Sequence, residues 1–292
     1  MRFVFLLLHY KNADVTMRCV DSIINMESRE TYDIVIVDNA SKNGSIEELR
    51  AKYTTRPNIH FLENEENLGY AKGNNVGFTY AKNILHADYV CLANNDVVFE
   101  DKKWIDKVCS LYEREHYYVL GPDVVTPDGV HQNPFRATVS STGRVLKNLL
   151  HDVVVYILLK MGLQKKLSEK IHTKSVWEEC DWKNSQNDFN GVLHGSCLVF
   201  SPLFIDDFDG LYSGTFLYAE EDILCYILHK LHDKYTYSNE VQVLHCHSTS
   251  FKRTYQDDSE RKKVMVRHRI RSYFKFFKIT LKRRNIAQYL KS

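Results

Sequence analysis

Short apolar runs alternate with longer amphipathic segments along the first 120 residues. Each run is almost continuously apolar, as expected for a strand buried on both faces of a parallel sheet. Strands are expected at 3–8, 33–37, 58–62, 88–93 and 118–120. Helices are expected at 14–26 and 104–114, and a further helix opens within 67–75 and runs to about residue 85. This alternation predicts an α/β fold with a mostly parallel central sheet flanked by helices.

The pattern is less regular after Gly121. Residues 145–163 carry apolar side chains mostly at helical spacing and predict an amphipathic helix. A strand is expected over 193–200, and another from 241 toward His245. Between them, a run of apolar residues is followed by three consecutive acids at the start of an expected helix, Glu220, Glu221 and Asp222.

Polar residues follow the expected strands. Asn94, Asn95 and Asp96 come directly after the fourth strand, and open α/β sheets bind their ligands at the carboxyl ends of strands. A hard cation takes oxygen ligands, so Asp96 is a candidate for holding a divalent ion while a diphosphate fills the remaining positions. A turn that caps the next helix is the alternative.

Charge is distributed unevenly along the 292 residues. The net charge is +2, but residues 261–292 contain twelve Lys and Arg and no acid, which leaves 27 − 37 = −10 for the preceding residues. This contrast predicts a basic helical tail at 251–292 behind a main unit at 1–250, itself divided into halves at about 1–120 and 121–250.

The seven cysteines are scattered, without a CxxC pair or a framework spacing, which favours a reducing compartment. The apolar run at 3–8 is too short for a signal sequence, and no window approaches the ~20 apolar residues of a membrane span. The sequence therefore predicts a cytoplasmic protein that meets the inner face of the cell membrane only at its surface.

The segment Asn67-Leu68-Gly69-Tyr70-Ala71-Lys72-Gly73-Asn74-Asn75 is similar to the signature N-x-G-[FY]-[AS]-x-[GA]-x-N. With Asn94-Asn95-Asp96, it resembles the inverting nucleotide-sugar glycosyltransferases of family 2, of the bacterial surface-polysaccharide, rhamnosyltransferase-like type. The resemblance covers about residues 1–250. It implies a GT-A fold and an Mg²⁺ or Mn²⁺ ion bound at Asp96.

The resemblance also assigns residues to the nucleotide sugar. Tyr10 would lie against the base, with an ordinary strand-end aromatic as the alternative. Asp38 would accept a hydrogen bond from the N3–H that uracil and thymine share, or would instead form an Asx-turn. Lys72 would meet the diphosphate one turn into a helix. The expected nucleotide-sugar residues are Tyr10, Asp38, Asn39, Asn67, Gly69, Lys72, Asn94 and Asn95.

Inverting transfer needs a carboxylate that takes a proton from the acceptor hydroxyl. The resemblance places Glu221 in that position, with Glu220 and Asp222 as alternatives, and a purely structural charge cluster remains a further possibility. His245, before His247, is the expected histidine near the metal or the diphosphate, and a structural role for one of the two is the alternative.

These features predict a metal-dependent inverting glycosyltransferase that moves a sugar from a UDP- or dTDP-sugar to a polysaccharide or lipid-linked saccharide. A sugar-1-phosphate nucleotidyltransferase is a second candidate, but it needs a Gly-rich loop after the first strand, and residues 9–12 do not form one. A non-catalytic carbohydrate- or nucleotide-binding subunit is a third, which the joint presence of Asp96, the three acids and His245 disfavours.

Residues 261–292 predict a basic amphipathic helix. Its apolar stripe, within about 100° of arc, comprises Val266, Ile270, Tyr273, Phe274, Phe277 and Leu281. An anionic membrane surface is the expected partner, and packing of the stripe on the main unit is the alternative. The motifs for sugar transfer disfavour nucleic acid as a partner.

Overall fold

The computed structural model describes residues 1–162, 189–246, 258–282 and 284–291. Its strands are β1 (Arg2–His9), β2 (Thr31–Asp38), β3 (Ile59–Glu63), β4 (Tyr89–Asn94), β5 (Val97–Val98), β6 (Val119–Val125), β7 (Cys197–Phe200) and β8 (Tyr235–His245). Its helices are α1 (Ala13–Ile24), α2 (Ser45–Lys52), α3 (Gly69–Asn83), α4 (Trp104–Glu115), α5 (Thr142–Lys160), α7 (Pro202–Asp207), α8 (Glu220–Leu231), α10 (Asp258–Thr280) and the 3₁₀ turn η3 (Ile286–Leu290).

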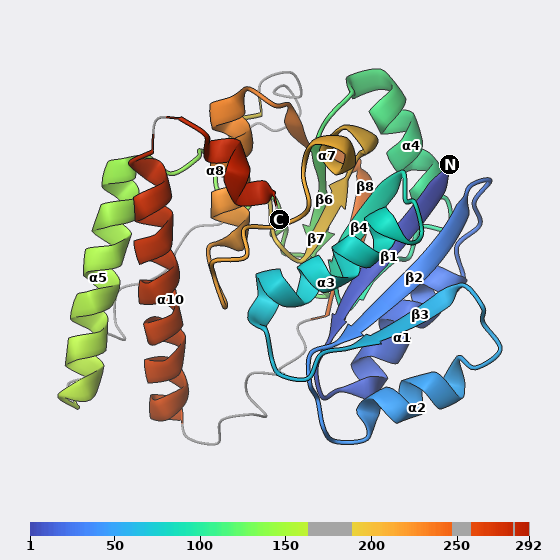
Figure 1. Ribbon diagram of the computed structural model, residues 1–292, viewed down its shortest axis with the longest axis horizontal. Coiled ribbons are helices and arrows are strands. Elements are labelled where there is room, and N and C mark those ends of the chain that lie inside the picture. Colours follow the sequence, from blue (N-terminus) through green and yellow to red (C-terminus); the bar gives the residue numbers. More distant parts are fainter. Residues whose placement is uncertain (163–188, 247–257, 283, 292) are drawn as a thin grey trace.

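The strands form one sheet in the order β3-β2-β1-β4-β7-β6-β8-β5 (Figure 1). The first four are parallel, as the sequence predicts, whereas β7 runs antiparallel to both β4 and β6. The parallel half therefore brings the ends of β1, β2 and β4 to one edge, and β7 joins it to the second half of the chain.

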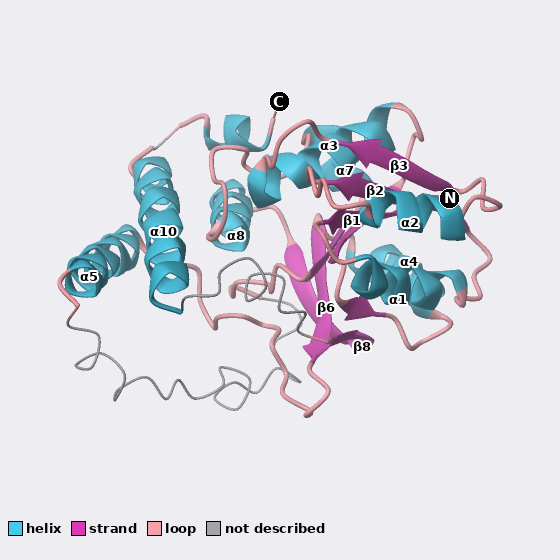
Figure 2. Ribbon diagram, turned by 90° about the horizontal axis from the view of Figure 1, so that it is seen from below, coloured by secondary structure: helices cyan, strands magenta, loops and turns pink. Residues whose placement is uncertain are grey.

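Helices cover both faces of the sheet (Figures 1 and 2). Alternate residues of β1 belong to different cores: Phe3, Phe5 and Leu7 pack with α1 and α4, whereas Val4 and Leu6 pack with α3 and the later helices. Burial on both sides explains why β1 is an unbroken apolar run.

The small residues of α3 allow it to lie close to the sheet. A Cβ on Gly77 would stand 2.1 Å from Leu6 Cδ1, and one on Gly73 would stand 2.8 Å from Leu8 Cδ1. The glycine spacing of this helix is thus explained by packing against β1.

β7 is shorter than expected, because it begins at Cys197 rather than at Leu193. The backbone of the preceding residues bonds elsewhere: Arg136 and Val192 form an isolated bridge, and the His194 amide donates to the side chain of Asn133 at 3.0 Å. These residues therefore line a loop beside the sheet instead of extending it.

α10 lies side by side with α5 at one end of the molecule (Figures 1 and 2). Of the apolar stripe expected on the tail, Val266 and Tyr273 are buried, while Phe274 and Leu281 are exposed. The helix is therefore packed on the main unit through part of that stripe, which was the alternative interpretation. No helix among the described residues is long and apolar enough to cross a bilayer.

Candidate active site

The ends of β1 and β2 are fixed by buried polar contacts. His9 contacts the hydroxyls of Thr16 and Ser45, each at 2.8 Å, and burial lowers the pKa of its ring. The Asp38 carboxylate accepts hydrogen bonds from the amide and the hydroxyl of Ser41. Asp38 is therefore buried and bonded within its own loop, to the residue three positions on, and its contact with a nucleotide base stays a prediction.

Asn39 connects β2 to the start of α3. Its amide nitrogen donates to Asn67 Oδ1 and to the Gly69 carbonyl, each at 3.1 Å, and its Oδ1 accepts from the Leu68 amide at 3.0 Å. Asn39 is buried, whereas Asn67 is exposed. The structure thus brings Asn39, Asn67 and Gly69 together, with Asn39 holding the loop in place.

Tyr10 and Lys72 are placed differently from those residues. Tyr10 is partly exposed after β1, with Lys11 Nζ 4.9 Å from its ring centroid. Lys72 is exposed on α3 and lines a cavity of about 520 Å³ together with Tyr289 and Lys291 of the C-terminal segment. Lys72 therefore shares this surface cavity with the C-terminal segment.

Asn94, which ends β4, and the next two residues contact different partners. The backbone N–H of Asn94 donates to the Ser196 carbonyl at 2.8 Å. The side-chain nitrogen of Asn95 donates to the Thr16 hydroxyl at 2.9 Å. Asp96 Oδ1 lies 3.3 Å from His245 Nε2, so the end of β4 meets the end of β8. His247, the second predicted histidine, lies outside the described residues.

The Asp96–His245 pair has the chemistry of a cation site. His245 Nδ1 lies 2.7 Å from Gln132 Oε1, which can only accept, so Nδ1 donates and Nε2 is the ring atom that faces Asp96. A carboxylate oxygen and an imidazole lone pair suit a divalent ion, but the described residues contain no group of three or more His, Cys, Asp or Glu that would hold one. A bound diphosphate would add oxygen ligands to such an ion.

The three acids of α8 have distinct environments. Asp222 is buried and is held by Arg136 through two contacts of 2.6 Å. Glu220 is buried. Its pKa is raised to about 8, mainly by burial and to a lesser extent by the charge of Glu221. Glu221 is partly exposed. Its pKa is raised to about 7, mainly because most of the carboxyl is shielded from water and to a lesser extent by the charge of Asp222.

Gly195 connects Glu221 to the parallel half of the sheet. Glu221 Oε2 lies 3.5 Å from where a Cβ on Gly195 would stand, and the Gly195 carbonyl accepts from the Tyr70 hydroxyl at 2.7 Å. The next residue, Ser196, accepts from Asn94 at the end of β4. One short loop therefore joins the acid to the strand end that precedes Asp96.

The loop before α8 is held by α10. Tyr218 and Ala219 both have positive φ, 73° and 69°, which is costly for residues with a side chain. Ser272 donates to the Leu217 carbonyl at 2.8 Å, and His268 stacks on Phe216 with ring centroids 4.9 Å apart. These contacts help hold the strained segment 216–219, which precedes α8 and orients the three acids at its start.

Sequence reasoning missed four residues of this arrangement: Tyr70, Gln132, Arg136 and Gly195. Tyr70 lies inside the signature segment but drew attention only as part of the pattern. Gln132, Arg136 and Gly195 lie in irregular loops, where no periodicity indicates which side chain they meet.

Residues 6–171, more than half of the chain, match glycosyl transferase family 2, and the protein belongs to that family. A relative is the low-salt glycan biosynthesis hexosyltransferase Agl10 of Haloferax volcanii, 24% identical over 214 residues. That match covers 73% of this chain and 59% of Agl10, so the chain spans less than two thirds of the relative.

Two solved structures share the fold. S. aureus TarS 1–349 in complex with UDP has a TM-score of 0.56 at 13% identity, covering 99% of this chain and 68% of TarS. The mannosyltransferase PcManGT of Pyrobaculum calidifontis, in complex with GDP-Man and Mn²⁺, has a TM-score of 0.55 at 12% identity, covering 93% and 69%. The expected GT-A fold is thereby confirmed.

Proposed function

We propose that the protein is a metal-assisted, inverting glycosyltransferase in which Glu221 is the general base. The observation that carries the proposal is the loop 194–196, which links Glu221 to the strand end before Asp96. Inversion requires that the donor diphosphate, held near Asp96, and the acceptor hydroxyl, held near Glu221, lie on opposite sides of the transferred sugar.

The residues have separate tasks in this proposal. Asp96 and His245 would hold Mg²⁺ or Mn²⁺, which offsets the charge that develops on the leaving diphosphate. Glu221 takes the proton of the acceptor hydroxyl, and its raised pKa suits that task near neutral pH. Asp222 and Arg136 fix the start of α8.

The donor is proposed to be a UDP- or dTDP-sugar, because Asp38 at the end of β2 keeps acceptor capacity for a pyrimidine N3–H. The complex of TarS with UDP supports this choice, whereas the complex of PcManGT with GDP-Man supports a purine donor. The acceptor is proposed to be a growing surface polysaccharide or a lipid-linked saccharide, with rhamnose among the sugars transferred, and the enzyme to act in the cytoplasm at the inner membrane face.

Calorimetric titration of the full chain with UDP, dTDP and GDP in the presence of Mn²⁺ tests the donor. UDP or dTDP should bind at least about tenfold more tightly than GDP, and Asp38→Asn should remove that preference. Tighter binding of GDP would overturn the pyrimidine assignment while leaving the role of Glu221 to be tested separately.

A further inference from the structure

Helix α5 exposes a continuous stripe of large apolar side chains. Leu146, Leu150, Val154, Ile157 and Met161, which follows the helix, are between 38% and 65% exposed. At 100° per residue they fall within about 80° of arc, along a helix about 28 Å long. The buried residues Val145, Leu149, Asp152 and Leu159 lie on another side of the helix.

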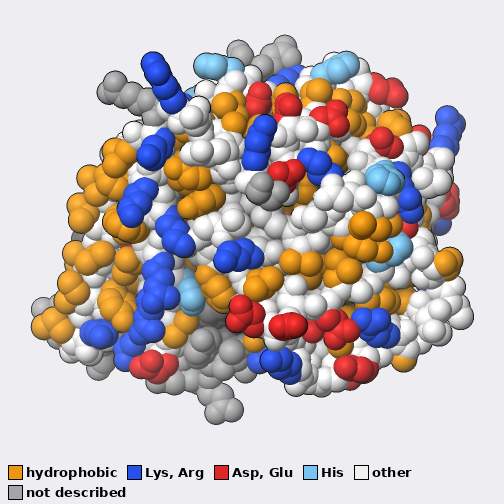
Figure 3. Space-filling view, in the orientation of Figure 1, with side chains coloured by type: hydrophobic (Ala, Val, Ile, Leu, Met, Phe, Trp, Pro, Cys, Tyr) orange, Lys and Arg blue, Asp and Glu red, His pale blue; other side chains and the backbone are white. Residues whose placement is uncertain are grey.

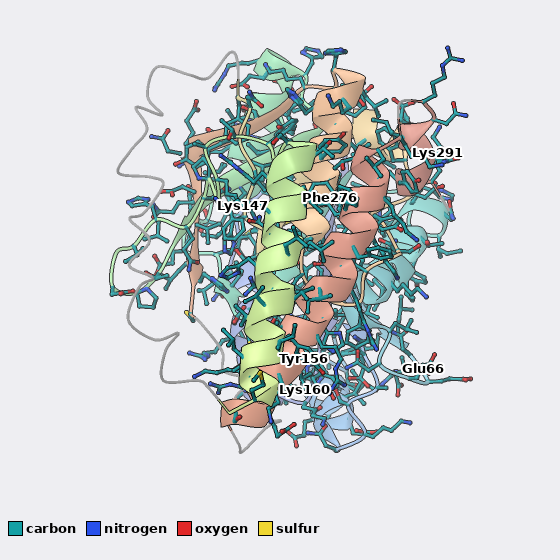
Figure 4. The ribbon with its side chains drawn as sticks, turned by 90° about the vertical axis from the view of Figure 1, so that its left-hand side faces the viewer. Glu66, Lys147, Tyr156, Lys160, Phe276 and Lys291 are labelled. Carbon is teal, nitrogen blue, oxygen red and sulfur yellow. The ribbon has the colours of Figure 1, made fainter. Side chains whose placement is uncertain are left out.

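Cations border this stripe. Arg144, Lys147 and Lys160 are exposed on α5, and Figure 4 shows Lys147 and Lys160 on this helix, which faces the viewer beside α10. In Figure 3, Lys and Arg side chains form a column over α10, next to the apolar edge over α5. The exposed cations of α10 include Arg267, Arg271, Lys275 and Lys278.

Among the described residues, the two helices α5 and α10 carry few acids. Residues 142–162 contain a single acid, Asp152, which is buried and paired with Arg269 of α10 at 2.5 Å. Residues 261–292 contain none, and Glu260 at the start of α10 is exposed and pairs with Lys263 at 2.7 Å. The surface formed by the α5 stripe and its flanking cations, here called the α5–α10 face, is therefore apolar in the middle and positive at its borders.

We propose that the α5–α10 face docks on an anionic lipid bilayer. Exposed aliphatic side chains enter the headgroup boundary while neighbouring Lys and Arg meet anionic headgroups, as in interfacial amphipathic helices. A second copy of the chain fits less well, because a two-fold contact through this face would bring the basic column of each copy toward the other. The apolar contact is thus made mainly by α5, rather than by the stripe expected on the C-terminal tail.

Docking here would place the acceptor side of the proposed site near lipid. α10 borders the face and also holds the 214–219 loop through Ser272 and His268. A lipid-linked acceptor would then arrive beside the helix that carries Glu221. This consequence rests on the proposed function, whereas docking itself is measured without donor or acceptor.

Vesicle sedimentation of the full chain tests the proposal. Binding to phosphatidylcholine vesicles containing phosphatidylglycerol should exceed binding to phosphatidylcholine alone and should fall as salt rises. The double variant Leu150→Ser/Ile157→Ser should lose about tenfold in partitioning for each side chain. Lys147→Glu/Lys160→Glu should lose about fivefold or more for each cation.

Matched variants separate this face from general surface effects. Ile84→Ser/Val130→Ser removes two equally exposed apolar side chains elsewhere, and Lys102→Glu/Lys103→Glu reverses two cations on the other side of the sheet; both should bind vesicles as wild type does. Equal binding by the α5 variants and wild type would overturn the proposal. So would a wild-type dimer in sedimentation velocity that Leu150→Ser/Ile157→Ser dissociates, with no binding to anionic vesicles.

Discussion

The guanidinium of Arg136 donates two hydrogen bonds of 2.6 Å to the carboxylate of Asp222. Both oxygens of Asp222 are thereby engaged, and the side chain is only 2% exposed. Asp222 is therefore a poor candidate to receive a proton from an acceptor. Glu220 is also buried, whereas Glu221 is partly exposed.

This arrangement predicts different outcomes for three isosteric variants. Glu221→Gln should lower kcat by about 10²-fold or more with little change in donor affinity, because it removes the base but not the diphosphate site. Glu220→Gln and Asp222→Asn should each cost less. Steady-state kinetics and donor titration decide, and a larger loss of kcat in Glu220→Gln would reassign the base.

Activity should depend on pH through Glu221. Its pKa is raised from 4.5 to about 7 by burial and by the charge of Asp222, so the carboxyl is protonated and inactive as a base below that value. We expect kcat/KM to rise with pH to a midpoint near 7. Asp222→Asn should move the midpoint to lower pH, because one raising charge is lost while Arg136, which lowers the pKa, remains.

Removing the metal should weaken donor binding. Wild-type affinity for UDP or dTDP should fall about tenfold or more in EDTA, and Asp96→Asn should bind equally with and without Mg²⁺ or Mn²⁺. His245→Gln should reduce the metal effect in the same titration. His60→Gln is the matched control, because His60 pairs with Asp33 on β2. Equal nucleotide affinity of wild type in EDTA and in Mn²⁺ would refute the metal role.

Two glycine substitutions test the packing of α3. Gly77→Ala should destabilise the protein by about 1–3 kcal/mol, because the new methyl group would meet Leu6 at 2.1 Å and Val37 at 2.8 Å. Gly143→Ala, where the new methyl meets nothing within 4 Å, should be neutral or stabilising by up to about 1 kcal/mol. Urea unfolding measures both, and equal effects would show that contact with β1 does not explain the glycine.

Much of the parallel half could be predicted because its signals are local. β1, β2, β3 and β4 lie within two residues of their expected bounds, since buried parallel strands are continuous apolar runs. The strand-end residues Asn94 and Asp96 followed from the same pattern. The resemblance to the family also placed His245 near the metal expected at Asp96, and the two side chains lie 3.3 Å apart.

The rest depends on long-range contacts that leave no local pattern. Arg136 lies 86 positions from Asp222, and nothing in its own segment indicates that it binds a buried carboxylate. Lys72 lines a surface cavity together with Tyr289 of the C-terminal segment, and its contact with the diphosphate stays a prediction. An amphipathic stripe likewise does not reveal its partner, and on α10 part of it faces the protein itself.

The support that α10 gives to the 214–219 loop sets an order of events during synthesis. Ribosomes deliver the chain from its N-terminus, so β1 to β4 and even Glu221 emerge before Ser272 and His268. A nascent chain that stops between α8 and α10 already carries every acid of the site but lacks the contacts that hold them in direction. The enzyme is therefore expected to gain its turnover late, with the synthesis of a helix that contains none of its proposed catalytic residues.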